Sequence, residues 1–223
     1  MIPLSLAKRN LRVLAVGAHS DDLEIGAGGT LLRLDQHVSG LQVRCVVLTA
    51  DGERAAEARA SAAAFLPSAH LDFSAHALRD GYLPVQWDRV KEILTKAAEF
   101  SPDVILCPGV ADAHQDHRTV AQIVPTVFRD HLVLQYEIIK WDGDLGAGRP
   151  THYVPLTEEI MARKCHLLAE HFATQRDKDW FGEDTFRALG RLRGVECRAA
   201  FAEAFTVPKA LIDFGQPDGR ERP

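Results

Sequence analysis

Two short clusters of histidine and aspartate hold the side chains of this sequence that are best suited to chemistry. The clusters are AHSDD at residues 18–22 and AHQDH at residues 113–117. Imidazole nitrogens and carboxylate oxygens are typical ligands of zinc in proteins, and the same groups act as general acids and bases. The residue types and their spacing therefore point to a metal-assisted reaction.

In the first cluster, His19 and Asp22 are three residues apart. In a tight turn or a first helical turn this spacing brings both side chains to one side, where one nitrogen and one oxygen could bind zinc. Asp21 flanks the same position without having to be a ligand. The alternative is structural, because His19 could end a strand while the two aspartates cap the helix that follows.

In the second cluster, two histidines flank an aspartate within four residues. His117, at the expected start of a helix, can supply a third metal ligand, and His114 lies one helical turn earlier and can face the same site. Asp116 can orient His114, as carboxylates outside a ligand set commonly orient histidines. Each histidine alone could be an ordinary surface residue, but two such clusters together favour one shared metal site.

Both clusters directly follow predicted strands, which explains how they could meet. We predict strands at 11–17, 41–50, 69–73 and 103–109, alternating with helices at 26–37, 54–66, 86–99 and 117–128. This alternation predicts a Rossmann-like α/β fold, a mostly parallel sheet with helices on both faces. Ligands of such sheets bind at the carboxyl ends of the strands, where both clusters would lie.

The pattern changes after residue 130, although one domain over residues 1–223 is still expected, with its core at about 10–140. A strand at 131–141, a loop at 142–150, helices near 157–171 and 183–192, and a last strand at 199–207 are predicted. We expect a C-terminal α+β capping segment, at about 141–210, to fold over the active-site end of the sheet. The polar tail at 213–223 is expected to fray.

Composition excludes several classes of protein. The 223 residues carry 26 basic and 31 acidic side chains, a formal charge of −5, and no basic block that would indicate a nucleic-acid surface. No apolar run of about 18 residues predicts a transmembrane helix, and the N-terminus lacks the features of a secretory signal. The four cysteines are widely spaced, which favours free thiols in a reducing compartment and a cytoplasmic location.

The glycine-rich stretch GAGGT at residues 26–30 raises the alternative of a dinucleotide site. The glycines begin well after the first strand ends, and Leu31 stands where the fingerprint requires glycine. We therefore disfavour a protein that binds NAD or another nucleotide. The glycines are expected to let a helix pack close to the sheet.

The two clusters and their surroundings resemble the LmbE-like, or PIG-L, family of zinc-dependent N-deacetylases. The family motif A-H-P-D-D is similar to AHSDDLEIGAGGTL, in which Ser20 replaces proline, and its motif H-x-D-H is similar to HQDH. The alanine-rich stretch RAAEARASAAAFL, the late element HFATQ and the strand AEAF at residues 202–205 also resemble the family. Ser20 and Leu23 depart from the usual pattern, but neither change removes an expected ligand.

This resemblance implies a division of roles among the clustered residues. It assigns one zinc ion per chain to three ligands: His19, Asp22 and His117. Asp21 would be the general base, and His114 would stabilise the oxyanion or protonate the leaving amine. Asp116 would tune His114 by raising its pKa, because a nearby negative charge favours imidazolium.

The resemblance also implies a small-molecule substrate, an N-acetylated amino sugar of the N-acetylglucosamine type or its conjugate. Further candidates for substrate contacts are Arg54, Glu137, Lys140, Asp142, His171 and Gln175. Trp141 could stack on a sugar ring or serve in a core or interface, and a homo-oligomer remains open. The alternatives are another zinc amidase or esterase, or a non-catalytic metal-binding module. A structural zinc is usually closed by four Cys or His ligands, and the spare acid–base groups here favour catalysis.

Overall fold

A twisted seven-stranded sheet forms the centre of the part of the chain that the structure, a computed structural model, describes: residues 3–6, 8–145 and 148–212. The strands are β1 (Arg12–Gly17), β2 (Gln42–Val47), β3 (His70–Ala75), β4 (Val104–Pro108), β5 (Leu132–Tyr136), β6 (His152–Leu156) and β7 (Phe201–Thr206). Their order is β3-β2-β1-β4-β5-β7-β6, with β1 to β5 parallel and β7 antiparallel to both of its neighbours. The predicted α/β class with a mostly parallel sheet is confirmed.

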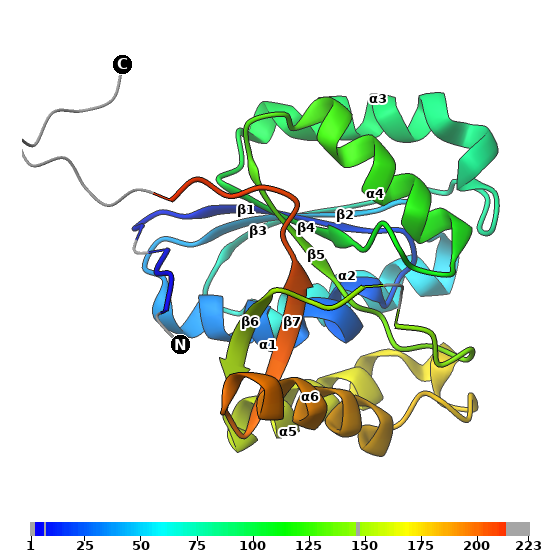
Figure 1. Cartoon of the computed structure of the whole chain (residues 1–223). Coiled ribbons are helices and arrows are strands. Elements are labelled where there is room, and N and C mark those ends of the chain that lie inside the picture. The colour runs from blue at the N-terminus through cyan, green and yellow to red at the C-terminus, as the bar shows by residue number, and fades with distance from the viewer. Residues whose placement is uncertain (1–2, 7, 146–147, 213–223) are drawn as a thin grey trace, which may run out of the picture.

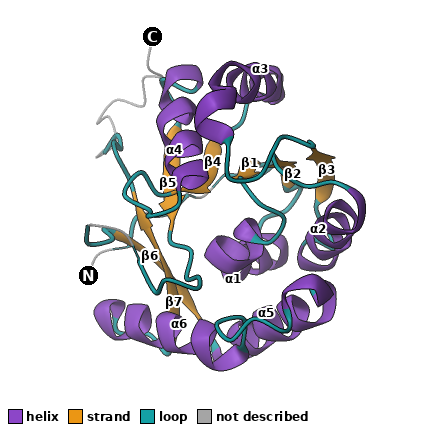
Figure 2. Cartoon of the chain, turned by 90° about the vertical axis from the view of Figure 1, so that its right-hand side faces the viewer, coloured by secondary structure: helices purple, strands orange, loops and turns teal. Residues whose placement is uncertain are grey.

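Helices cover both faces of this sheet (Figure 1). They are α1 (Asp22–His37), α2 (Gly52–Phe65), α3 (Trp87–Ala97), α4 (Gln115–Val127), α5 (Glu158–His171) and α6 (Glu183–Cys197), with short 3-10 turns η1 (Leu83–Gln86), η2 (Ala98–Phe100) and η3 (Ala173–Gln175). Helices α3 and α4 pack on one face, and α1 and α2 on the other. Figure 2 shows α5 on the outer side of α1 and α2, and α6 packs beside it on β6 and β7.

The alternation of side chains along β1 explains why the sheet is covered twice. Val13 and Ala15 belong to the core under α1 and α2, whereas Leu14 and Val16 belong to the core under α3 and α4. Successive side chains of a strand point to opposite faces, so a strand that is apolar throughout is buried on both.

The glycine-rich stretch of α1 packs close to its neighbours, as predicted. A Cβ atom on Gly26 would lie 2.2 Å from the ring of Tyr136 in β5, and one on Gly29 would lie 2.5 Å from Leu156 in β6. The ring of Tyr136 is fixed in turn, because its hydroxyl donates a 2.6 Å hydrogen bond to the carbonyl of Val16 in β1. Because Gly26 and Gly29 have no side chains, α1 can pack closely against the sheet.

The C-terminal segment differs from the prediction. The structure adds an unpredicted strand, β6, and places β7 between β5 and β6, so part of the segment at 141–210 extends the sheet instead of covering its end. Pro155 is tolerated in β6 because this is an edge strand. The predicted strand at 131–141 ends at Tyr136, and the predicted helix near 183–192 continues to Cys197.

A buried ion pair ties this segment to α1. The carboxylate of Glu203 in β7 accepts hydrogen bonds of 2.7 Å from the backbone N–H groups of Gly29 and Thr30 and from Nζ of Lys164 in α5. The same Lys164 Nζ donates to the carbonyl of Ile25, at 2.7 Å. Strand β7, helix α5 and the middle of α1 are therefore joined at one buried point.

Two further expectations concern the described residues. Within them, no helix is both long enough and apolar enough to cross a membrane. The four cysteines are free thiols, with Cys45, Cys107 and Cys165 buried and Cys197 partly exposed. The tail at 213–223, which was expected to fray, lies outside the described residues.

Candidate active site

The two predicted clusters meet at the carboxyl ends of β1 and β4, which lie side by side at the centre of the sheet. From β1 the chain continues to β2 on one side, while β4 on the other side comes later in sequence, so strand order reverses between β1 and β4. Such a reversal opens a crevice in which α/β proteins bind ligands. His19 follows β1, and His114 and His117 lie at the start of α4.

Three side chains of this cluster, those of His19, Asp22 and His117, have the spacing of metal ligands. His19 Nδ1 lies 3.1 Å from His117 Nε2, Asp22 Oδ1 lies 3.3 Å from His117 Nε2, and Asp22 Oδ2 lies 3.5 Å from His19 Nδ1. Ligands on bonds of about 2.0–2.1 Å in a tetrahedron around zinc are separated by about 3.3 Å. The donor types and their separations therefore fit a divalent ion such as zinc.

The turn that carries the first cluster is fixed locally. The backbone N–H of His19 donates to Asp22 Oδ2 at 2.8 Å, and the carbonyl of Ala18 accepts from the hydroxyl of Thr49 at 2.7 Å. Asp22 is also the first residue of α1. Asp21 stands at the N-cap of α1, but its side chain makes no capping hydrogen bond. Asp22 both holds the turn and faces the histidines, so its structural and chemical roles are compatible.

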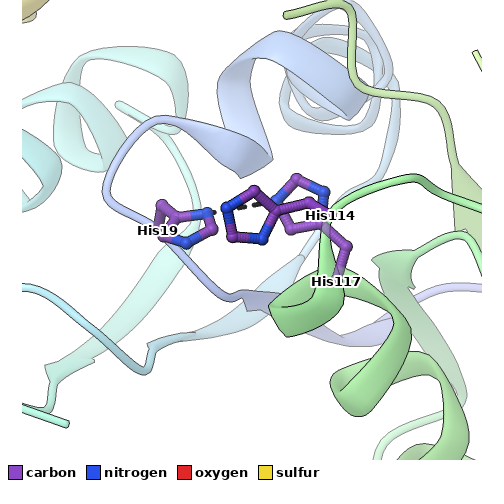
Figure 3. Close-up of side chains that lie close together, drawn as sticks. All are labelled: His19, His114 and His117. Atoms are coloured by element: carbon purple, nitrogen blue, oxygen red, sulfur yellow. Dashed lines mark hydrogen bonds between the residues drawn. The ribbon is translucent and has the colours of Figure 1, made fainter. Parts of the chain in front are cut away.

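His114 joins the same group from the start of α4. Figure 3 shows the rings of His19, His114 and His117 converging, and their nearest nitrogens all lie within 4.8 Å of one another. The backbone N–H of Asp116 donates to His114 Nδ1 at 3.2 Å. Because Nδ1 is an acceptor, the proton of the neutral ring is on Nε2, which leaves His114 a hydrogen-bond donor.

Three carboxylates outside this group contact the histidines. Asp112 Oδ2 lies 2.9 Å from His117 Nδ1, while Asp80 Oδ1 and Asp116 Oδ2 lie 3.1 and 3.4 Å from His19 Nε2. Carboxylates in this position fix the orientation of histidine ligands and make them better electron donors. The nitrogens of His19 and His117 that face away from Asp22 thus each lie close to a carboxylate.

The expected role of Asp116 requires a correction. Its carboxylate accepts hydrogen bonds from the backbone N–H groups of Gly81 and Leu83, at 2.7 and 3.0 Å, and approaches His19. Its direct hydrogen bond to His114 comes from its backbone. The side chain is fully buried at the start of α4. Its carboxylate faces the loop that precedes η1 and the first residue of η1.

The charges of the cluster favour a cation at its centre. Burial would lower the pKa of both imidazoles, but Asp22 and the outer carboxylates raise that of His117 to about 9 and that of His19 well above its usual value. Burial would raise the pKa of Asp22, but His117 and His19 hold it well below its usual range. Asp22 contacts the two facing nitrogens and the other carboxylates contact the outer ones, so this environment stabilises positive charge on the two rings.

The two remaining acid–base groups have the opposite character. Burial and the neighbouring Asp22 raise the pKa of Asp21, and Arg54 lowers it in part. Burial and the charges of the other two imidazoles lower the pKa of His114, although Asp116 raises it. Asp116 thus raises the pKa of His114 as expected, but burial and the other two imidazoles outweigh it.

A cavity of about 190 Å³ opens over the cluster. Some of the predicted substrate contacts line this cavity, namely Arg54, Lys140 and Gln175. Three others lie elsewhere: Glu137 is bound by Arg193 at 2.8 Å, Asp142 accepts from the backbone of Asp144 at 3.0 Å, and His171 ends α5. The Glu137 and Asp142 carboxylates have protein partners, so we no longer expect them to bind substrate. Lys140 Nζ lies 3.0 Å from Asp112 and is buried, which makes it a support for that carboxylate.

Sequence reasoning missed four residues of the site: Asp80, Asp112, Lys178 and Trp180. Asp112 lies two residues before His114, so its closeness to the second cluster could have indicated it. The other three lie in loops far from both motifs in sequence, where no periodic pattern exists. Only the packing of the chain brings them to the cavity.

Comparison with known proteins agrees with this geometry. The sequence profile of the PIG-L family, described as GlcNAc-PI de-N-acetylase, matches residues 14–128. The uncharacterised deacetylase YaiS of Escherichia coli K12 is 33% identical over 132 residues, which span 53% of this chain and 69% of YaiS. Strand β4, most of β1 and both clusters lie within residues 14–128, the range that the family profile matches.

Solved structures share the fold at low identity. The N,N'-diacetylchitobiose deacetylase of Pyrococcus horikoshii, in complex with an inhibitor, has a TM-score of 0.67 at 19% identity, over 88% of this chain and 83% of that one. The 4-carboxy-2-hydroxymuconate hydratase GalB of Pseudomonas putida KT2440 has a TM-score of 0.70 at 14% identity, over 92% and 99%. One fold thus carries two reactions, and these likenesses show the fold alone.

An α/β domain with a histidine–aspartate centre at its strand-order reversal has the donor set of a metal-dependent enzyme. The family profile covers about half of the chain, including that centre, and the similarity to YaiS extends over most of that protein. The chain therefore belongs to the PIG-L, or LmbE-like, family, and it is a deacetylase, an enzyme that hydrolyses amide bonds.

Proposed function

We propose that this deacetylase removes the N-acetyl group from an amino sugar of the N-acetylglucosamine type, free or conjugated, with one zinc ion per chain. The observation that carries the proposal is the triangle of His19, Asp22 and His117 with two acid–base groups, Asp21 and His114, beside it in one cavity. The family description and the chitobiose deacetylase support an N-acetylated sugar as substrate.

The proposed ligands are His19 Nδ1, Asp22 and His117 Nε2. Three protein ligands leave a position open for water and substrate, as in catalytic zinc sites. When bound there, the ion would supply Lewis-acid activation of the amide carbonyl and of the attacking water. Asp112, Asp116 and Asp80 would hold the outer nitrogens of the two rings.

Asp21 is the proposed general base. It lines the cavity without belonging to the triangle, and the guanidinium of Arg54 lies 3.8 Å from its carboxylate. Its raised pKa suits a group that must accept a proton near neutral pH, because proton transfer is most effective when the pKa lies near the working pH. Asp21 would take a proton from the attacking water while the oxygen of this water bonds to the amide carbon.

His114 is the proposed donor to the developing oxyanion. Its Nδ1 is occupied by the backbone of Asp116, so the neutral ring presents the Nε2 proton. A donor that is already oriented stabilises negative charge as it forms, without reorganisation at that moment. When the C–N bond breaks, the proton taken by Asp21 goes to the amine, and the products are acetate and a free amino sugar.

Arg54 and Asp80 form a polar pair on the cavity wall, with NH1 and Oδ2 separated by 3.5 Å. The side chain of Asp80 is half exposed, so its carboxylate can accept a hydrogen bond from a ligand. A donor and an acceptor side by side match the hydroxyl groups of a sugar ring. We propose that this pair orients the sugar, which places its acetamido group over the triangle.

The test combines metal content with acetate release. The purified protein should hold about one zinc per chain and release acetate from N-acetylglucosamine derivatives. Chelation should abolish this activity, and zinc should restore it. His19→Ala and His117→Ala should each lower metal content and activity together. Full metal occupancy in the double variant would refute the ligand assignment, and a zinc-loaded enzyme that releases no acetate from any N-acetylglucosaminide would refute the substrate.

A further inference from the structure

The side chain of Ser20 is not explained by the roles described so far. Ser20 follows β1, lies in sequence between a proposed ligand and the proposed base, and is 1% exposed. Two hydrogen bonds hold this turn, one to the Asp22 carboxylate and one from the Thr49 hydroxyl, and neither involves Ser20. The hydroxyl of Ser20 instead accepts a hydrogen bond from Arg54 Nε, at 3.1 Å. This contact links the turn to α2, which carries Arg54.

The guanidinium of Arg54 has a different partner for each of its three nitrogens. Nε donates to Ser20, NH1 lies 3.5 Å from Asp80 Oδ2, and NH2 lies 3.8 Å from Asp21 Oδ1. Both carboxylate distances are longer than an ordinary charge-assisted hydrogen bond, which measures about 2.7–2.9 Å. Because the Nε–H bond lies in the plane of the guanidinium, a hydrogen bond at this atom fixes that plane. Ser20 therefore sets the rotation of the guanidinium between the two acids.

Without the bond to Ser20, this guanidinium would have a competing arrangement. The side chains of Arg54 and Asp80 are 32% and 52% exposed, so both can move, whereas Asp21 is buried. A guanidinium matches a carboxylate best in a bidentate pair with two parallel N–H···O bonds. A rotation of Arg54 toward Asp80 would form such a pair and occupy the acceptor proposed for the sugar. The hydroxyl of Ser20 holds Arg54 away from this arrangement.

The serine is also a departure in sequence. The motif A-H-P-D-D has proline where this chain has Ser20. The side chain of proline has no hydroxyl to accept a hydrogen bond, so an arginine beside it would be placed by carboxylates alone. The replacement keeps every proposed ligand and adds one acceptor. The contact with Arg54 is therefore a property of this chain and not of the motif.

We propose that Ser20 is a positioning residue for the deacetylase reaction, and that its hydroxyl orients Arg54 so that Asp80 stays free to bind substrate. This inference rests on the proposed function, because the group held by Arg54 and Asp80 would be a hydroxyl of the sugar. Ser20 acts through Arg54 and does not touch the substrate. A contact that orients a binding group contributes equally to the bound substrate and the transition state, so its loss raises KM and changes kcat little.

The test measures KM and kcat for N-acetylglucosamine in single and double variants. Ser20→Ala should raise KM about 10-fold, the effect of one hydrogen bond, while kcat changes less than about 3-fold and zinc content stays that of the wild type. Arg54→Ala should raise KM as well. Adding Ser20→Ala to Arg54→Ala should change KM less than about 2-fold further, because the serine acts only through the arginine. An unchanged KM in Ser20→Ala, or an equal rise in both backgrounds, would overturn the proposal.

Thr49→Val is the matched control for the turn. The hydroxyl of Thr49 also supports this turn, but its hydrogen goes to the carbonyl of Ala18, at 2.7 Å, and not to Arg54. Any effect of Thr49→Val on KM should therefore be the same with and without Arg54. If this effect also vanishes in the Arg54→Ala background, the whole turn positions the guanidinium, and the specific role of Ser20 is refuted.

A spectroscopic measurement separates this inference from the proposed function. The NMR signal of Arg54 Nε–H, identified by its loss in Arg54→Lys, should exchange slowly with water in the wild type, because its hydrogen is bonded to Ser20. Ser20→Ala should accelerate this exchange about 10-fold, and Thr49→Val should not. Absence of acetate release by the wild type would defeat the proposed function while the exchange rates still decide the contact. Equal exchange rates in the wild type and Ser20→Ala would defeat the positioning role, whatever the activity.

Discussion

Asp21 and Asp22 are adjacent in sequence but have opposite surroundings. Asp22 faces two imidazoles, whereas Asp21 faces the cavity and a guanidinium. The pKa of the first is lowered and that of the second is raised. Two neighbouring carboxylates whose pKa values are moved apart are suited to different tasks, metal binding and proton transfer.

Asp21→Asn tests this separation. The amide keeps the shape of the side chain but cannot accept the proton, so kcat should fall on the order of 10²–10⁴-fold. Zinc content, measured by mass spectrometry of the purified variant, should stay near that of the wild type. Asp22→Asn is the comparison, and it should lose metal. If Asp21→Asn loses its zinc instead, the two roles are exchanged.

His114→Ala tests the oxyanion donor. The variant should retain zinc and bind substrate with a similar KM, while kcat falls roughly 10²–10³-fold, the usual effect of removing such a donor. His114→Gln, whose side-chain amide can also donate a hydrogen bond, should recover part of the loss. Steady-state kinetics with parallel metal analysis would measure these changes. A normal kcat in the alanine variant would show that His114 is not the oxyanion donor.

Asp112 is a positioning residue in this arrangement, since it contacts His117 and Lys140 but does not face the reacting atoms. Asp112→Asn should weaken zinc binding 10–100-fold, as measured with a competing chelator. Asp142→Asn is the control, because Asp142 also approaches Lys140, at 3.5 Å, but does not contact His117. Equal affinities in the two variants would show that the contact with His117 does not matter for the metal.

The central residues of the site could be predicted because strand ends and motif spacing are local in sequence. The supporting residues could not be predicted in the same way. Asp116 lies beside His114 in sequence, yet its carboxylate points to Gly81 and His19, which belong to other loops. Which neighbour a buried carboxylate chooses depends on tertiary packing, and no local pattern records it.

At the scale of elements, the parallel half of the sheet follows from sequence, but the other edge does not. Strands β1, β2 and β4 are short runs with β-branched residues that alternate with helices, and such runs predict a doubly covered sheet. Strand β6 contains Pro155 and has no alternation of polar and apolar residues. The position of β7 between β5 and β6 depends on pairings between distant segments, which propensity does not encode.

The Glu203 contact predicts a large effect on stability. Glu203→Gln leaves Lys164 without its buried partner, so the free energy of unfolding should fall by about 3–5 kcal/mol in urea titrations. Glu183→Gln removes one partner of the exposed ion pair with Arg187, at 3.6 Å. This substitution should change the free energy of unfolding by less than about 1 kcal/mol. Similar values for both variants would mean that the buried pair does not hold α1 to β7.

At the scale of the whole molecule, the reactivity of the cysteine thiols measures how well the native packing excludes a reagent. Burial raises the pKa of Cys107 to about 12 and that of Cys165 to about 11, and it also raises that of Cys45. Since the thiolate is the reactive form, a thiol reagent at pH 8 should modify Cys197 first in the native protein. The other three should react only on unfolding. Rapid modification of all four, followed by peptide mass analysis, would contradict the closed packing described above.

The place of β7 in the sheet also has a consequence for how the chain is made. This strand is the last of the described elements to leave the ribosome, yet it lies between β5 and β6 and supplies the carboxylate that binds the middle of α1. A nascent chain that has emerged only as far as α6 already carries every proposed ligand and the base. It lacks β7, the strand that joins β6 to the rest of the sheet, and with it the carboxylate of Glu203 that binds the middle of α1. Completion of the site therefore waits for the synthesis of β7, and a chain cut short before residue 201 should emerge with its catalytic motifs but without the support that positions them.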